Sequence, residues 1–238
     1  MINLDGRLRL HPDFRHTVQR VGREQAPVLV VDDFLADPGV LIDVAEQDAT
    51  FDAVTDTFYP GIRAPLPAIY RFAVRAFLGN LIAGTFGLGE RAVARELGHF
   101  SLVTTPPARL TPLQRQPHVD SADPLQLAVL HYLCDATHGG TSFYRHRGTG
   151  FESIDAARIV PYGAALRMEG ETRGPPPSGY IRGDDAGFER TASFEAAFNR
   201  VLVYRSITLH SPDIAPAASF DARPRSGRLT ANTFFFYR

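Results

Sequence analysis

Short apolar runs separated by turn residues dominate the chain from about residue 96 onward. These runs are the stretches 100–105, 125–133, 141–144, 200–206 and 229–237. Runs of this length, rich in valine, leucine and aromatic residues, predict strands rather than helices. The pattern therefore predicts an all-β core over residues 96–238, and it contains no internal repeat.

The first 95 residues have a different pattern, which predicts one strand and two supporting helices. The run 28–31 is apolar and β-branched and ends at two aspartates, as a buried strand would. A helix is then expected to begin with Asp37 as its N-cap and Pro38 in its first turn.

The second helix is predicted over residues 68–86, with Gly87 as its C-cap. The positions that share one stripe of this helix are Phe72, Arg75, Ala76, Gly79 and Ala83. The proline-rich stretch 173–179 is expected to be a surface loop rather than a linker. We therefore expect a single domain over 1–238, mainly β with flanking helices.

Composition narrows the classes of partner. Hydrophobic residues make up 44 % of the chain and charged residues 21 %, and the net charge is −1, so a polyanionic partner such as nucleic acid is disfavoured. No apolar run is long enough to span a membrane. The chain has one cysteine and no charged-then-apolar leader after Met1, which favours a cytoplasmic location. The oligomeric state is not predicted.

The candidate chemistry lies in a histidine and an aspartate two positions apart, His118 and Asp120, and in a second histidine, His210, after an apolar strand. In an extended segment, side chains at i and i+2 point to the same face. Two imidazoles and one carboxylate form the facial triad of non-haem iron sites. A second H-x-D, at His11 and Asp13, precedes the predicted core and contains a proline, so a structural role in a turn or at the start of a helix is expected there.

Several motifs around this triad resemble those of prolyl-4-hydroxylase-like 2-oxoglutarate oxygenases. They are, in the family's order, VVDDFL at 30–35, LHYLC at 130–134, GGTSF at 139–143, NRVLVY at 199–204 and GRLT at 227–230. Together they span nearly the whole chain, and the best match is an uncharacterised bacterial branch. The resemblance implies a double-stranded β-helix core (jelly roll, cupin-like) with Fe(II), 2-oxoglutarate and O2.

The resemblance also implies roles for individual residues. His118, Asp120 and His210 would bind iron, and Arg228 would pair with the distal carboxylate of 2-oxoglutarate. Arg228 follows the distal histidine by eighteen positions rather than the family's usual spacing, so Arg223 and Arg225 are rivals in the intervening segment. Arg228 is preferred because it opens a strand of alternating residues, whereas its rivals flank a proline.

Tyr132 matches a family tyrosine that donates its hydroxyl to the same carboxylate. The alternative is a core tyrosine whose hydroxyl is satisfied within the protein.

The reaction implied is hydroxylation of a C–H bond with release of succinate and CO2. Asp120 argues against halogenation, because related halogenases have a small residue there. Nucleic-acid demethylation fits poorly, since Phe234 stands where that branch has a second arginine. The substrate, a small molecule or a peptide, would be selected by segments 53–67 and 145–180.

Several other polar residues are weaker candidates for the functional site. Three arginines in these segments, Arg63, Arg145 and Arg147, are candidates to meet an anionic substrate or are solvated charges. His131, His138 and His146 are expected to be ordinary polar residues or substrate contacts, and Cys134 lacks a partner for nucleophilic catalysis.

Two readings compete with an oxygenase. One is a metal-binding jelly-roll or cupin-like protein without turnover, such as a sensor or a degenerate enzyme. The other is a structural β-sandwich that serves as an interaction module. A cationic residue placed to anchor a co-substrate distinguishes the enzyme from the metal binder. In the interaction module, both histidines should be replaceable without loss of function.

Overall fold

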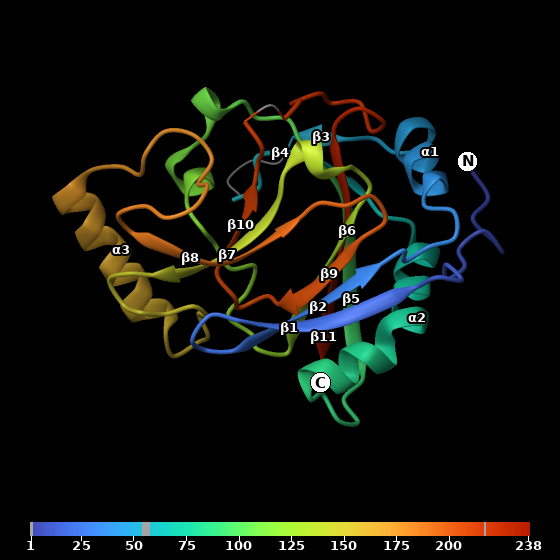
Figure 1. Ribbon diagram of the computed structural model, residues 1–238, viewed down its shortest axis with the longest axis horizontal. Coiled ribbons are helices and arrows are strands. Elements are labelled where there is room, and N and C mark those ends of the chain that lie inside the picture. Colours follow the sequence, from blue (N-terminus) through green and yellow to red (C-terminus); the bar gives the residue numbers. More distant parts are fainter. Residues whose placement is uncertain (1, 54–57, 217) are drawn as a thin grey trace.

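Two antiparallel sheets form the body of the protein in the computed structural model, which describes residues 2–53, 58–216 and 218–238 (Figure 1). The larger sheet has the strand order β1-β2-β9-β6-β11-β5-β4-β3, and the smaller has the order β10-β7-β8. The strands are β1 Arg15–Val21, β2 Ala26–Asp32, β3 Asp52–Ala53, β4 Gly61–Pro65, β5 Val93–Val103, β6 Gln126–Tyr132, β7 Gly140–His146, β8 Phe188–Glu195, β9 Val201–Arg205, β10 His210–Asp213 and β11 Arg228–Tyr237. The predicted mainly β, jelly-roll-like fold is confirmed.

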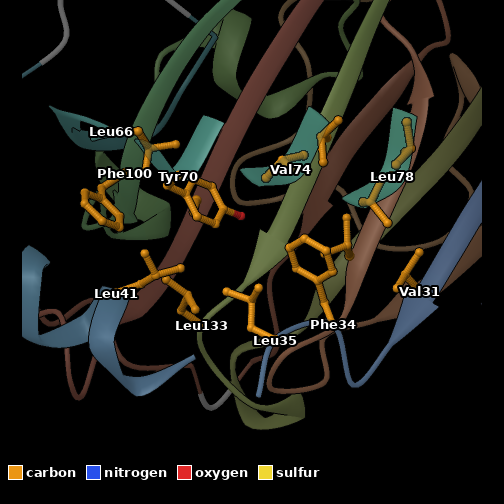
Figure 2. Packing of buried hydrophobic residues seen from close by; sticks show 14 of the residues in the cluster. Val31, Phe34, Leu35, Leu41, Leu66, Tyr70, Val74, Leu78, Phe100 and Leu133 are labelled. Carbon is orange, nitrogen blue, oxygen red and sulfur yellow. The ribbon is translucent and has the colours of Figure 1, made fainter. Parts of the chain in front are cut away.

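Helices cover one face of the larger sheet and one end of the smaller (Figure 1). They are α1 Gly39–Gln47, α2 Ala68–Phe86 and α3 Ile159–Arg173, with 3₁₀ turns η1 Pro107–Arg109, η2 Pro112–Arg115 and η3 Ala136–His138. Tyr70, Val74 and Leu78 of α2 point toward Val31 and Phe34 (Figure 2). No helix in the described ranges combines the length and apolar character needed to cross a bilayer.

The opposite face of the larger sheet packs against the smaller sheet. Phe143 of β7 lies between Phe194 of β8 and Tyr204 of β9, with ring centroids 5.6 and 5.2 Å away and nearly perpendicular planes. Edge-to-face contacts of this kind are favourable for buried aromatic rings. The two sheets thus enclose a second apolar cluster, separate from the one under the helices.

The strand β11 shows how the two faces are divided. Leu229, Ala231 and Phe235 belong to the apolar cluster on the helix side. The alternate residues, from Arg228 to Phe234, line a pocket between the sheets. This division follows from the alternation of side chains along a strand, so one strand supplies both core and pocket.

The helix α2 has the predicted bounds but buries a different face. It ends at Phe86, and Gly87 follows in the left-handed conformation with φ of 61°. The buried residues of α2 are Tyr70, Ala73, Val74, Leu78, Ile82 and Phe86. Phe72 of the predicted stripe is 58 % exposed. The stripe was wrong because a helix with apolar residues on several faces does not reveal which face meets the sheet.

The start of α1 also differs from the prediction. Its N-cap is Pro38, and no side chain caps the helix. Asp37 instead accepts a hydrogen bond from Arg7 at 2.8 Å. An ion pair with a preceding segment has therefore replaced the expected cap.

All of the predicted strands are present, and several elements were not predicted. Residues 1–95 contribute four strands to the larger sheet rather than one. In the second half, β8, β10 and α3 were missed, because β8 is partly exposed and α3 buries only Tyr162. The proline-rich stretch after α3 is irregular, as predicted.

A buried polar chain ties α2 to the sheet through His131. The Tyr70 hydroxyl lies 2.9 Å from His131 Nδ1, and His131 Nε2 lies 3.2 Å from the Asn199 carboxamide oxygen. That oxygen only accepts, so Nε2 carries the proton and Nδ1 accepts from the tyrosine. Burial lowers the pKa of His131 to about 4.

We expect this histidine to make stability depend on pH. The pKa is about 4 in the folded protein and 6.5 ordinarily, so the unfolded chain binds a proton first as the pH falls. The neutral His131 side chain therefore makes its full contribution to the free energy of unfolding above pH 6.5. As the pH falls toward 4, the free energy of unfolding decreases by up to about 3 kcal/mol. Denaturant unfolding at several pH values should show a smaller loss for His131→Gln than for wild type. His16→Gln, on the exposed strand β1, should show the same dependence of the free energy of unfolding on pH as the wild type. The same dependence in all three proteins would contradict the role given to His131.

Candidate metal centre

Backbone hydrogen bonds bring the three candidate ligands together. His118 N donates to the His210 carbonyl at 2.8 Å, and His210 N donates to the His118 carbonyl at 2.9 Å. Asp120 N donates to the Ser206 carbonyl at 2.9 Å. His210 opens β10, whose other edge pairs with Phe143 of β7. The segment 118–120 is therefore held by an isolated bridge rather than by a regular strand.

The side chains of these residues converge. Asp120 places one carboxylate oxygen 3.8 Å from His118 Nε2 and the other 3.6 Å from His210 Nε2. One ligand atom from each residue lies within 4.8 Å of the others. Within the described ranges this is the one group of three or more histidine, cysteine, aspartate or glutamate side chains that converge closely enough to hold a metal ion.

The histidine tautomer suits a metal ligand. His210 Nδ1 lies 2.8 Å from the Thr208 carbonyl oxygen, which can only accept, so the proton is on Nδ1. The lone pair is therefore on Nε2, the atom that faces Asp120. Metal-binding histidines usually have their second ring nitrogen held in this way.

Burial shifts the pKa values of the other two candidate ligands. The side chains of His118 and Asp120 are 14 % and 18 % exposed. Burial, then His210 and Arg63, hold the pKa of His118 well below its ordinary value, which favours the neutral imidazole that a metal needs. Burial raises the pKa of Asp120, although His210 and Arg63 act in the opposite direction. A cation bound between them would favour the carboxylate form, so this donor set fits a divalent metal.

Aromatic rings enclose the histidines. Phe58 stacks on His118 with centroids 5.1 Å apart and planes at 6°, and Tyr204 lies 4.8 Å from His210. These rings limit the access of water to the ligand atoms. Residues 54–57 of the segment expected to select the substrate lie outside the described residues.

The same pocket contains Arg228. This side chain is 3 % exposed, and its Nη2 donates to the Gly140 carbonyl at 2.7 Å. Its Nε is buried and has no hydrogen-bond partner among the residues that the structure describes. Gly140 is required here, because a Cβ would lie 2.1 Å from the Phe194 carbonyl oxygen. The pocket is lined by Tyr59, Pro60, Arg63, His118, Asp120, Ala128, Val129, Leu130, Thr141, Tyr204, His210, Pro212, Arg228, Thr230, Asn232 and Phe234.

Tyr132 lies behind this lining. Its hydroxyl is 2.7 Å from Thr141 Oγ1, and its ring centroid is 5.7 Å from the Arg228 guanidinium carbon. Thr141 lines the pocket, whereas Tyr132 does not. The Tyr132 hydroxyl is thus satisfied within the protein, as the alternative for this tyrosine supposed. The side chain lies next to both Thr141 and Arg228.

The two rival arginines lie outside the pocket. Arg223 forms an exposed ion pair with Asp221, and Arg225 pairs with Asp43 and Glu46. Both side chains are more than half exposed. Arg228 is therefore the one of the three that lies in the pocket of the triad.

The remaining candidate residues lie elsewhere. His11 Nδ1 accepts from the backbone N–H of Asp13 at 3.1 Å, which is the structural turn predicted for the second H-x-D. His138 contacts Asp135 and the Ser226 carbonyl. His146 is buried near Glu169, with 3.3 Å between Nε2 and the carboxylate. Burial raises the pKa of Cys134 to about 11, so its thiol stays protonated.

Sequence reasoning missed several residues of the pocket that carry polar groups: Thr141, Tyr204, Thr230 and Asn232. Thr230 and Asn232 follow Arg228 at intervals of two along β11. The signal for them was the period of two in a strand that opens with a pocket residue. Thr141 lies within the quoted GGTSF motif, but nothing in the sequence linked it to Arg228.

Two solved structures align with this chain over most of its length at low sequence identity. The crystal structure of a novel N-substituted L-amino acid dioxygenase from Burkholderia ambifaria AMMD aligns with a TM-score of 0.37 and 11 % identity, covering 90 % of this chain and 83 % of that one. The crystal structure of EvdMO1 aligns with a TM-score of 0.38 and 15 % identity, covering 93 % of this chain and 55 % of that one.

No protein of curated function matches the sequence. A family profile does match, from residue 12 to residue 235, which is nearly the entire chain. The protein therefore belongs to DUF6445, a family of unknown function.

Proposed function

We propose that the protein is an Fe(II)- and 2-oxoglutarate-dependent oxygenase that hydroxylates a C–H bond of an organic substrate. The observation that carries the proposal is the presence of a two-histidine, one-carboxylate set and a buried arginine in one pocket. A facial triad leaves three metal positions for a bidentate oxo-acid and oxygen. A protein that only binds metal has no need for Arg228 beside it.

Each residue of the pocket has a role in this proposal. His118, Asp120 and His210 would hold the metal, with His210 oriented by its bond to Thr208. The bound metal supplies oxygen activation coupled to decarboxylation of the co-substrate. Overall, O2, 2-oxoglutarate and a C–H bond give succinate, CO2 and an alcohol, with one oxygen atom entering each of succinate and alcohol.

Arg228 would bind the distal carboxylate of 2-oxoglutarate. Its Nη2 is held by Gly140, and its Nε has no partner in the described residues. A charge-assisted hydrogen bond from a fixed guanidinium to a carboxylate is strong in a buried site. The Thr141 hydroxyl, oriented by Tyr132, is a second polar group in this part of the pocket.

Replacing one ligand should remove the metal. We expect anaerobic titration of the wild type with Fe(II) and 2-oxoglutarate to produce the weak visible charge-transfer band of the chelate. His210→Ala should lose more iron affinity than the roughly 10- to 100-fold that is typical when a residue outside the ligand set is changed. His11→Ala alters the other H-x-D motif and should bind iron as the wild type does. Equal iron content in the two variants, or no band in the wild type, would contradict the assignment of His210 as an iron ligand.

The anchor can be tested separately. Arg228→Gln should retain iron but raise the KM for 2-oxoglutarate by roughly 10- to 100-fold, because one hydrogen bond to a charged group is lost. The measurement is 2-oxoglutarate-dependent succinate release. Arg223→Gln and Arg225→Gln, which alter exposed ion pairs, are the matched controls. A larger effect in either control than in Arg228→Gln would assign the anchor to that residue.

A further inference from the structure

A second arginine, Arg63, reaches the pocket from a strand near β11. It lies on β4 opposite Ser101 of β5, and Ser101 lies opposite Thr230 of β11. Directly opposed residues of antiparallel strands share one face of the sheet. Arg63 and Thr230 are therefore on the same face, and both line the pocket.

Arg63 has no acidic partner in the part of the chain that the structure describes. Its Nε is buried and makes no hydrogen bond within the described ranges, and its guanidinium carbon lies 4.4 Å from the centroid of the Tyr59 ring. The other two arginines considered for an anionic substrate differ, because Arg145 pairs with Glu152 and Glu189, and Arg147 pairs with Asp184. A buried N–H donor without an acceptor is unfavourable, so Arg63 is the one of the three that is available to an anion.

The charges of the pocket indicate what that anion would be. Among the residues that the structure describes, the lining contains two arginines and one carboxylate, that of Asp120. On the proposed function, the divalent metal and the dianionic co-substrate cancel, which leaves one positive charge. One further negative charge would neutralise the pocket.

The pocket continues from Arg63 toward an apolar wall. Phe234 of β11 lies opposite Ala128 of β6, and Asn232 lies opposite Leu130. The side chains of Ala128, Leu130 and Phe234 belong to, or pack against, the apolar cluster between the sheets. They also line the pocket, so an apolar group would be favourable there.

We propose that Arg63 binds the carboxylate of the substrate, which is a small organic monocarboxylate whose apolar body lies against Ala128, Leu130 and Phe234. The inference rests on the proposed function and assigns different anions to the two arginines. Arg228 takes the co-substrate, and Arg63 takes the compound that is oxidised.

The test uses the anaerobic Fe(II)–2-oxoglutarate complex of the whole protein, in which no turnover occurs. The probes are hexanoate, 3-phenylpropanoate and N-acetyl-leucine, each compared with its primary amide, which has nearly the same shape and no charge. Binding is followed by the change in the charge-transfer band and by the rise in melting temperature. At least one carboxylate should bind about tenfold or more tightly than its amide and should increase succinate release in air.

Variants separate the two arginines. Arg63→Gln should form the charge-transfer band and bind that carboxylate roughly 10- to 100-fold more weakly, as expected for losing one charge-assisted hydrogen bond. Arg63→Lys should recover part of the affinity, and far-ultraviolet circular dichroism checks that both variants fold. Arg147→Gln removes an exposed arginine outside the pocket and should bind the carboxylate as the wild type does.

The outcomes distinguish the two proposals. Absence of the band in the wild type overturns both. A normal band with no preference for any carboxylate over its amide, or with undiminished carboxylate binding in Arg63→Gln, overturns the substrate class and leaves the oxygenase standing. Loss of the band in Arg63→Gln but not in Arg228→Gln shows that the roles of the arginines are reversed, which also overturns the inference.

Discussion

The paired hydrogen bonds between the backbones of His118 and His210 are the contact on which the site depends. They join segments far apart in the sequence and attach residues 118–120 to the edge of the smaller sheet. Because β10 is paired to β7 on its other edge, the candidate ligands are fixed to a sheet rather than carried on a free loop. Fixing side chains through the backbone is what a site needs to hold its geometry. The rest of the pocket is arranged around this bridge.

Burial of charge is the second constraint on the pocket. Arg228 and Arg63 each have a buried Nε that makes no hydrogen bond to the described residues, and both line the pocket that contains Asp120. Elsewhere in the protein buried arginines are paired, as Arg145 is with Glu152. Leaving charged groups incompletely paired costs free energy in the folded state, and such clusters are characteristic of sites that bind charged ligands.

The sequence predicted the strands of the core and the convergence of the ligands more fully than it predicted the remainder. The strands β6, β9 and β11 were found because they are apolar and bounded by turn residues. The partly exposed β8 and the largely polar α3 carry little of that signal, and the buried face of α2 is set by the sheet it meets. Arg228 was preferred over its rivals because it stands at the start of a predicted strand. The contact of Tyr132 with Thr141 depends on how two strands pair, which no local sequence pattern encodes. Arg63 was named only as one of three candidates, because a single sequence does not show which arginines have acidic partners.

The alternation of β11 has an evolutionary consequence. One side of this strand packs beneath the helices, while Asn232 and Phe234 on the other side line the part of the pocket farther along the strand from Arg228. Substitutions at these two positions can reshape the pocket without disturbing the layer beneath the helices. Members of the same family can therefore diverge in what they accept while keeping an unchanged scaffold, and comparison of these two positions offers a way to sort them into groups.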